Sequence, residues 1–140
     1  MRSFLIVFIL ISAMACKPNK SQSSKIASGD LNGNWVLFSL NGDKANVENF
    51  RERLPFINID TKEKKFTGFG GCNQIFGQII SEKGLLSFSN IAQSKMLCAP
   101  PNKEGEFLKA LQSTTNFEIN NDQLILSNPD KKIMVFQKAD

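Results

Sequence analysis

Histidine is absent from this chain of 140 residues, and with it the most common general base of active sites. A serine or cysteine nucleophile generally needs such a base, so Ser-His-Asp and Cys-His arrangements are excluded. A Ser-Lys dyad at Ser94 and Lys95 stays open, although neighbours on a strand point to opposite faces. Paired carboxylates also stay open, but we expect solvated charges because most candidates stand at turns: Asp60, Glu63, Glu82 and Glu118.

Ligands for metals and phosphate are also scarce. Without histidine, Cys72 and Cys98 fall short of the three or four ligands of a usual zinc site. A weaker hypothesis is Cu(I) at Met96 and Cys98, which are spaced M-x-C. The stretch 68–77, GFGGCNQIFG, lacks the third glycine of G-x-G-x-x-G and the Lys-Ser/Thr of a P-loop. We therefore expect no cofactor and no metal site.

An excess of charge of one sign is missing from most of the chain. The formal net charge is +4, but residues 29–138 contain 13 basic and 12 acidic side chains. Nucleic-acid binding normally needs a basic surface that neutralises phosphates. We therefore expect no nucleic-acid partner.

A long hydrophobic run is missing as well, since the apolar run from Phe4 to Ile11 is much shorter than the roughly 20 residues that span a bilayer. Its basic start and the small residues Ala13 and Ala15 predict a secretory signal peptide over residues 1–15. Cys16 follows, as in the lipobox of bacterial lipoproteins, although Ala13 stands where leucine is usual. We predict lipid attachment at Cys16, with secretion and a free N-terminal thiol as the alternative.

Cysteine is scarce, and its number agrees with lipidation. Of Cys16, Cys72 and Cys98, one would be an unpaired thiol in an oxidising compartment, and acylation of Cys16 removes it and leaves a pair. Residues 16–29 are rich in Ser and Lys and are predicted to be a flexible tether. Lys17 after the cysteine favours an outer-membrane lipoprotein facing the periplasm, under the sorting rule of some bacteria. The remaining residues, 30–138, fit one domain.

Short apolar segments separated by turn signals predict strands through this domain. The expected strands lie within 34–42, 56–69, 78–88 and 116–138, with hairpin turns at 61–64 and 82–84, and one or two helical turns are expected near 47–53. One strong helix follows Pro100-Pro101, with Asn102 as N-cap, Glu104 and Glu106 favoured by the helix dipole, and Phe107, Leu108 and Leu111 on one face. The predicted class is α+β, with an antiparallel, partly closed, barrel-like sheet packed on one main helix.

Five spaced motifs resemble the META domain, also called the HslJ-like domain. In the family's order they are Asn34-Trp35-Val36-Leu37, Gly68-x-x-Gly71-Cys72-Asn73-x-x-x-Gly77, Ser94-x-Met96-x-Cys98, Glu106-Phe107-x-x-Ala110-Leu111 and Leu124-x-Leu126. The resemblance implies a small α+β domain in which antiparallel strands wrap around a helix. It also implies a bacterial envelope lipoprotein associated with envelope stress or antibiotic tolerance, and it carries over no catalytic residues.

The glycine-rich stretch is then expected to be structural. Cys72 and Cys98 are predicted to form a disulfide under oxidising conditions, with two buried reduced thiols as the alternative. A structural turn is expected at Gly68, Gly71, Asn73 and Gly77, through positive φ or close approach at the glycines and side-chain hydrogen bonds of the asparagine. We predict a non-enzymatic protein that binds the membrane through its lipid and an unknown envelope protein or apolar ligand. The alternative is a small envelope hydrolase, or an inhibitor of an envelope-attacking enzyme.

Overall fold

The computed structural model describes residues 30–51 and 53–139. The predicted signal peptide 1–15, the predicted tether 16–29 and the lipid-attachment residue Cys16 lie outside the described residues. Across the described ranges, every helix is too short or too polar to cross a membrane.

The described chain is mostly strand. Its strands are β1 Gly33–Leu40, β2 Asp43–Lys44, β3 Phe56–Asp60, β4 Lys65–Phe69, β5 Gln74–Glu82, β6 Leu85–Gln93, β7 Asn116–Asn120, β8 Gln123–Ser127 and β9 Lys132–Lys138. A 3-10 turn, η1, spans Val47–Asn49, and the helix α1 spans Glu104–Gln112.

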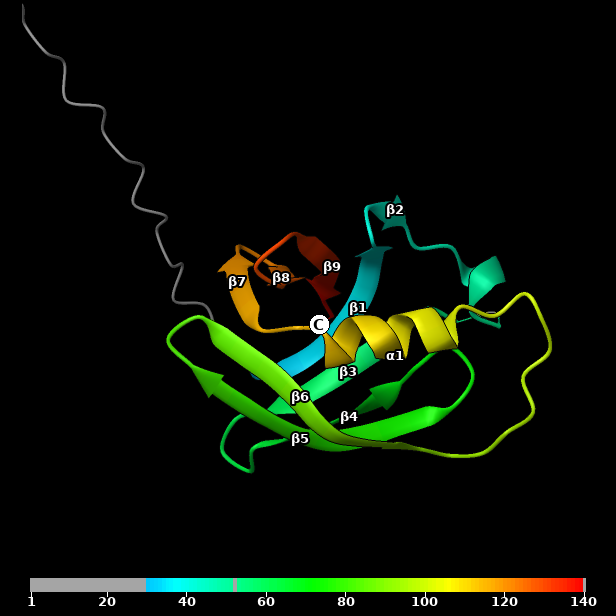
Figure 1. Cartoon of the computed structure of the whole chain (residues 1–140), viewed down its shortest axis with the longest axis horizontal. Coiled ribbons are helices and arrows are strands. Elements are labelled where there is room, and N and C mark those ends of the chain that lie inside the picture. Colours follow the sequence, from blue (N-terminus) through cyan, green and yellow to red (C-terminus); the bar gives the residue numbers. More distant parts are fainter. Residues whose placement is uncertain (1–29, 52, 140) are drawn as a thin grey trace, which may run out of the picture.

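All strand pairs are antiparallel, and the sheet order is β2-β1-β3-β4-β5-β6-β7-β8-β9. Because β1 also pairs with β9, the strands form a ring (Figure 1). The β6–β7 joint has a single registered pair, Leu85 with Asn116, and α1 lies in the connection between these two strands. The prediction of an α+β domain with an antiparallel sheet and one main helix is confirmed.

The core lies between the inner face of this ring and α1. Strand alternation buries Ile57 and Ile59 on β3 and Ile75 and Ile79 on β5, as period-two apolar patterns predict. From the helix, the core includes three buried apolar side chains, Phe107, Ala110 and Leu111. Phe107 meets Phe136 of β9 edge to face, with ring centroids 6.2 Å apart. Trp35 is fully buried and donates its indole N–H to the carbonyl of Leu31 at 2.9 Å.

Several local expectations need adjustment. The second hairpin is longer than predicted, since β5 and β6 have nine residues each. Ser94 and Lys95 follow the end of β6, so the expectation that they are strand neighbours is wrong. On α1, Leu108 is only partly buried, whereas Phe107 and Leu111 are fully buried.

Candidate functional site at the disulfide corner

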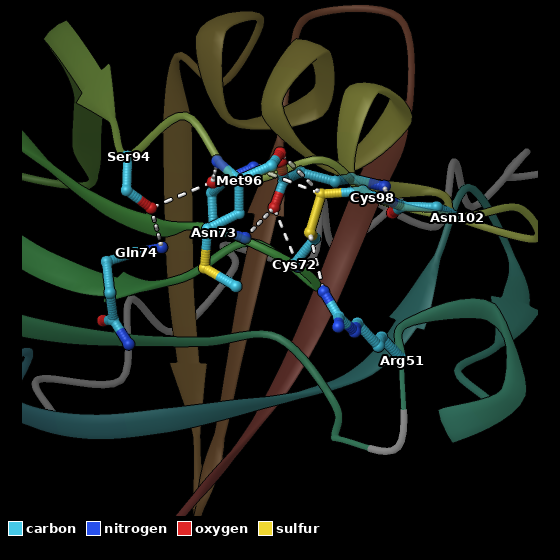
Figure 2. The surroundings of a disulfide bond; sticks show 9 residues. Arg51, Cys72, Asn73, Gln74, Ser94, Met96, Cys98 and Asn102 are labelled. Carbon is cyan, nitrogen blue, oxygen red and sulfur yellow. Dashed lines mark hydrogen bonds between the residues drawn. A yellow bond between two sulfur atoms is a disulfide. The ribbon is translucent and has the colours of Figure 1, made fainter.

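The glycine-rich stretch forms the corner between β4 and β5, and Cys72 lies in its bend. The predicted disulfide between Cys72 and Cys98 is present, with Cα atoms 6.0 Å apart and a sequence separation of 26. It fastens the bend to the segment 94–103, which leads from β6 to α1 (Figure 2). The alternative of two reduced thiols is therefore wrong, and Cys98 offers no thiolate for Cu(I) in this oxidised state.

Asn73 is the polar centre of the corner and is 3% exposed. Its side-chain oxygen accepts hydrogen bonds from the Ser94 hydroxyl at 2.9 Å and from the Met96 N–H at 2.8 Å (Figure 2). Its amide nitrogen donates to the Glu104 carboxylate at 2.7 Å and lies 3.4 Å from Cys98 Sγ. A single side chain thus ties the bend to both the 94–103 segment and the helix.

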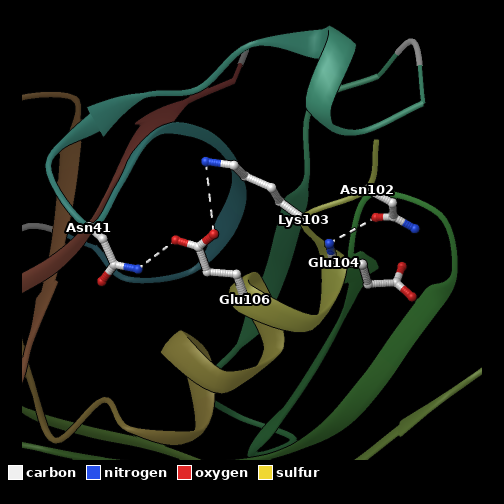
Figure 3. Close-up of polar contacts among 5 residues, drawn as sticks. All are labelled: Asn41, Asn102, Lys103, Glu104 and Glu106. Carbon is white, nitrogen blue, oxygen red and sulfur yellow. Dashed lines mark hydrogen bonds and ion pairs between the residues drawn. The ribbon is translucent and has the colours of Figure 1, made fainter. Parts of the chain in front are cut away.

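Glu104 is a buried carboxylate at the first position of α1. Its Oε2 accepts hydrogen bonds from the backbone N–H groups of Cys72 at 2.8 Å and Asn73 at 2.5 Å. The helix dipole further favours a negative charge at this position. The backbone N–H of Glu104 donates to Asn102 Oδ1 at 2.8 Å, so the predicted capping side chain is used, although Lys103 occupies the N-cap position (Figure 3).

The glycines of the predicted structural turn have two different roles. Gly71 lies in the bend with φ +122°, and a Cβ there would be 2.6 Å from Phe50 Cδ1. Gly68 and Gly77 instead lie inside β4 and β5, so their placement in a turn needs correction. A Cβ on Gly68 would overlap the carbonyl oxygen of Phe56 on β3, so the strands approach closely there.

The sequence predicts only that Glu104 is favourable at a helix start, and not that it belongs to the site. A signal for its burial exists in the sequence. Glu104 precedes Phe107 by three residues and Leu111 by seven, and this spacing places it on the apolar face of α1. Glu106 points elsewhere and is exposed, with contacts to Asn41 at 2.8 Å and Lys103 at 3.9 Å (Figure 3).

The outer surface of the corner is apolar. Met96 is 54% exposed and Leu97 is 98% exposed, between the hydrogen-bonded Met96 N–H and the disulfide at Cys98. A hollow of about 300 Å³ lies beside Leu97 and is lined by Glu48, Arg51, Leu97, Ala99, Pro100 and Pro101. The guanidinium of Arg51 reaches to 3.9 Å from Cys72 Sγ.

Of the remaining candidate residues, Ser94 joins this corner but uses its hydroxyl internally, since it donates to Asn73 and accepts from the Gln74 N–H at 3.2 Å. The candidate carboxylates lie outside the corner. Asp60 and Glu63 share the β3–β4 turn, where the Glu63 N–H donates to Asp60 Oδ1. The other two carboxylates lie on strands, Glu82 at the end of β5 and Glu118 in β7. In the part of the chain that the structure describes, no three Cys, Asp or Glu side chains gather as metal ligands would.

Solved structures share this fold. An NMR structure of a protein from Burkholderia xenovorans has a TM-score of 0.62 and 23% identity, over 77% of this chain and 82% of that chain. A second NMR structure has a TM-score of 0.60 and 22% identity, over 78% and 91% of the two chains. A crystal structure of a DUF4847 family protein from Bacteroides vulgatus has a TM-score of 0.52 and 17% identity, over 78% and 95%.

No curated protein matches the chain. The family comparison is informative, because the model of the META domain matches residues 25–140, which include every strand, the helix and both cysteines of the corner. The chain therefore belongs to the META domain family.

Proposed function

We propose that the chain is a membrane-anchored META-domain lipoprotein of the bacterial cell envelope, with a binding role and no enzymatic activity. The anchor is a lipid on Cys16, which becomes the first residue when the signal peptide 1–15 is removed. The location is the outer membrane, facing the periplasm. Family membership and the leader sequence support the envelope location. A connection to envelope stress or antibiotic tolerance follows from the family resemblance.

The exposure of Leu97 carries the binding proposal. Leu97 is 98% exposed and stands next to Met96, which is 54% exposed, at the edge of a hollow, so a partner that covered this segment would bury apolar surface and gain free energy. The neighbours of Leu97 are fixed in advance, by the hydrogen bond at Met96 and the disulfide at Cys98. A contact loop that is already ordered loses little conformational entropy when a partner binds.

The hollow beside Leu97 supports an envelope protein as the partner. Its volume of about 300 Å³ is at the small end for ligand pockets and suits one or two side chains of another protein. Glu48 and Arg51 line it and supply polar groups, as the rims of protein interfaces usually do. An apolar small ligand in the same hollow is the second candidate.

The chemistry of the corner supports a non-enzymatic role. Glu104, Asn73 and Ser94 direct their polar atoms at one another and at the backbone. Side chains used in this way stabilise the corner and are not free to activate a nucleophile or to hold a reacting group. This weighs against the small hydrolase that the sequence left open.

Site-specific photocrosslinking in cells tests the proposal. A photoreactive amino acid at Leu97 is expected to give a covalent adduct with one envelope protein, or a defined added mass from a small ligand. Phe38 on β1 is the matched control, because it is also an apolar side chain with 45% exposure. Equal labelling from both positions, or no adduct from Leu97, would contradict the binding role. Membrane fractionation of Cys16→Ser tests the anchor, and a variant that stays in the membrane fraction would exclude it.

A further inference from the structure

The β5–β6 hairpin exposes large apolar side chains on its outer face, among polar ones. Phe76 and Ile80 on β5 are 53% and 66% exposed, and Leu85 on β6 is 53% exposed. Gln78 lies between Phe76 and Ile80 and accepts a hydrogen bond from Asn90, so Phe76 is set apart toward the start of β5. Ile80 and Leu85, near the free end of the hairpin, form an apolar patch, called the hairpin strip below. Ile80 pairs with Ser87 and Glu82 pairs with Leu85, so Ile80 and Leu85 are diagonal neighbours on the outer face. Single exposed apolar residues are normal, but two neighbours near the free end of a hairpin indicate a contact surface.

The hairpin strip lies at the end of the sheet where the described chain begins. Gly33 of β1 pairs with Ile59, and the Asn32 side chain accepts the Thr61 N–H, so the start of β1 lies beside the β3–β4 turn. The β3–β4 turn also contacts β5, because the Ile79 N–H donates to the Lys64 carbonyl. The beginning of β1 and the free end of the β5–β6 hairpin lie on the same side of the molecule (Figure 1).

The length of chain before Asp30 places a bilayer within reach of this end. Fourteen residue steps separate Cys16 from Asp30 (30 − 16), and an extended chain of that length spans at most about 50 Å. A lipid on Cys16 would therefore keep the domain close to the membrane at all times. Under such tethering even a weak surface contact is populated, because its effective concentration is high.

We propose that the hairpin strip rests on the lipid bilayer and fixes the orientation of the domain, an inference that rests on the proposed lipid anchor. The chemistry of the surrounding residues fits an interfacial contact. Lysines and carboxylates are mixed on this end, since Lys62, Lys64, Lys65 and Lys83 stand near Asp60, Glu63 and Glu82, and Lys138 stands near Asp30 and Asp122. The apolar strip therefore supplies the contact, and the long lysine side chains can reach the headgroups around it.

The opposite end of the domain is then held away from the bilayer. The bend at Gly71–Asn73 joins the far ends of β4 and β5, beyond the pair Phe69 and Gln74. The segment 94–103 with Leu97 extends from that end, opposite the hairpin tip (Figure 1). An orientation set by the hairpin strip presents Leu97 to the periplasm, where it is available to the proposed partner protein.

Quenching of tryptophan by brominated lipids tests this orientation in the full-length protein. Ile80→Trp and Leu97→Trp place a reporter at each end, both at exposed positions, and the buried Trp35 gives a common background that the wild type measures. The proteins are reconstituted into vesicles of phosphatidylethanolamine and phosphatidylglycerol, with or without bromine on the acyl chains. The emission of Trp at position 80 is expected to fall by roughly half in brominated vesicles, and that at position 97 to remain unchanged.

The outcomes separate the orientation from the anchor. A protein whose mass shows the lipid, but whose Trp at position 80 is unquenched or is quenched no more than that at 97, would refute the orientation alone. A protein without lipid would refute the anchor, and the orientation with it. A lipidated protein that instead forms a dimer through the strip would show that a second copy covers it, and would also overturn the inference. Leu85→Asn added to Ile80→Trp is a second check, expected to lower the quenching of the reporter at position 80 toward that at position 97.

Discussion

The substitution Glu104→Gln tests whether the buried carboxylate organises the disulfide corner. Glu104 faces three donors, the N–H groups of Cys72 and Asn73 and the side-chain amide of Asn73. Glutamine has the same shape but only one acceptor oxygen. If that oxygen keeps the two backbone donors, its NH₂ group meets the NH₂ group of Asn73. If Asn73 rotates to avoid this, it gives up its bonds from Ser94 and Met96.

The expected cost follows from these contacts. A hydrogen bond to a charged group contributes roughly 1.5–3 kcal/mol, and a buried donor left without a partner costs a similar amount. One such bond is lost in Glu104→Gln, so the free energy of unfolding should fall by about 2–3 kcal/mol. Glu104→Ala removes the acceptor for all three donors and should cost about 4 kcal/mol or more.

Urea unfolding followed by the fluorescence of the buried Trp35 measures these values, since the midpoint shifts while the slope stays constant. A rescue makes the test specific. Asn73→Asp alone sets two carboxylates against each other, but combined with Glu104→Gln it recreates a donor facing an acceptor. The double variant should recover at least about 1 kcal/mol relative to the sum of the single changes.

Glu106→Gln is the matched control, because this glutamate lies on the same helix with its contacts exposed to solvent, and its effect should stay within about 0.5 kcal/mol. The reasoning would be refuted if Glu104→Gln changed stability no more than this control. It would also be refuted if the double variant showed no coupling between positions 73 and 104.

Two other features of the corner give separate predictions. Reduction of the Cys72–Cys98 disulfide should lower the free energy of unfolding by about 3 kcal/mol and raise the intact mass by about two hydrogens, and an unchanged mass would show that the bond is absent. Gly71→Ala should cost about 3 kcal/mol, because it adds a clash with Phe50 to the strain of positive φ. Gly42→Ala, also at positive φ but with open space around it, should cost only about 1 kcal/mol, and equal losses would exclude the clash as the cause.

Period-two patterns made most strands predictable, because a strand that is buried on one face must alternate. The run FINID gave β3, where Ile57 and Ile59 point inward, and the apolar spacing of Phe107 and Leu111 gave the buried face of α1. The disulfide was predictable for a different reason, since the predicted export would leave two cysteines for oxidising conditions to pair. These features depend on local periodicity or on composition.

The parts that escaped prediction depend on contacts between distant segments. Glu104 accepts from residues 31 and 32 positions earlier in the chain, and no local pattern specifies such a partner. Gly68 and Gly77 look like turn residues in the sequence, yet their strands need them because the neighbouring strand or side chain comes too close for a Cβ. The exposure of Leu97 could not be predicted from the sequence either, since leucine and cysteine are both residue types that are usually buried.

In the corner, the residues that stabilise the fold are different from the residue that is exposed for contact with a partner. Asn73, Glu104 and the disulfide use the backbone atoms and the inward side chains of the bend, the 94–103 segment and the helix start. Leu97 takes no part in these interactions, although both of its neighbours do. Substitutions at Leu97 should therefore change a contact without changing the free energy of unfolding, whereas substitutions at Asn73 or Glu104 should change stability first. Leu97 can therefore be substituted to test the proposed contact while the interactions that hold its two neighbours stay in place.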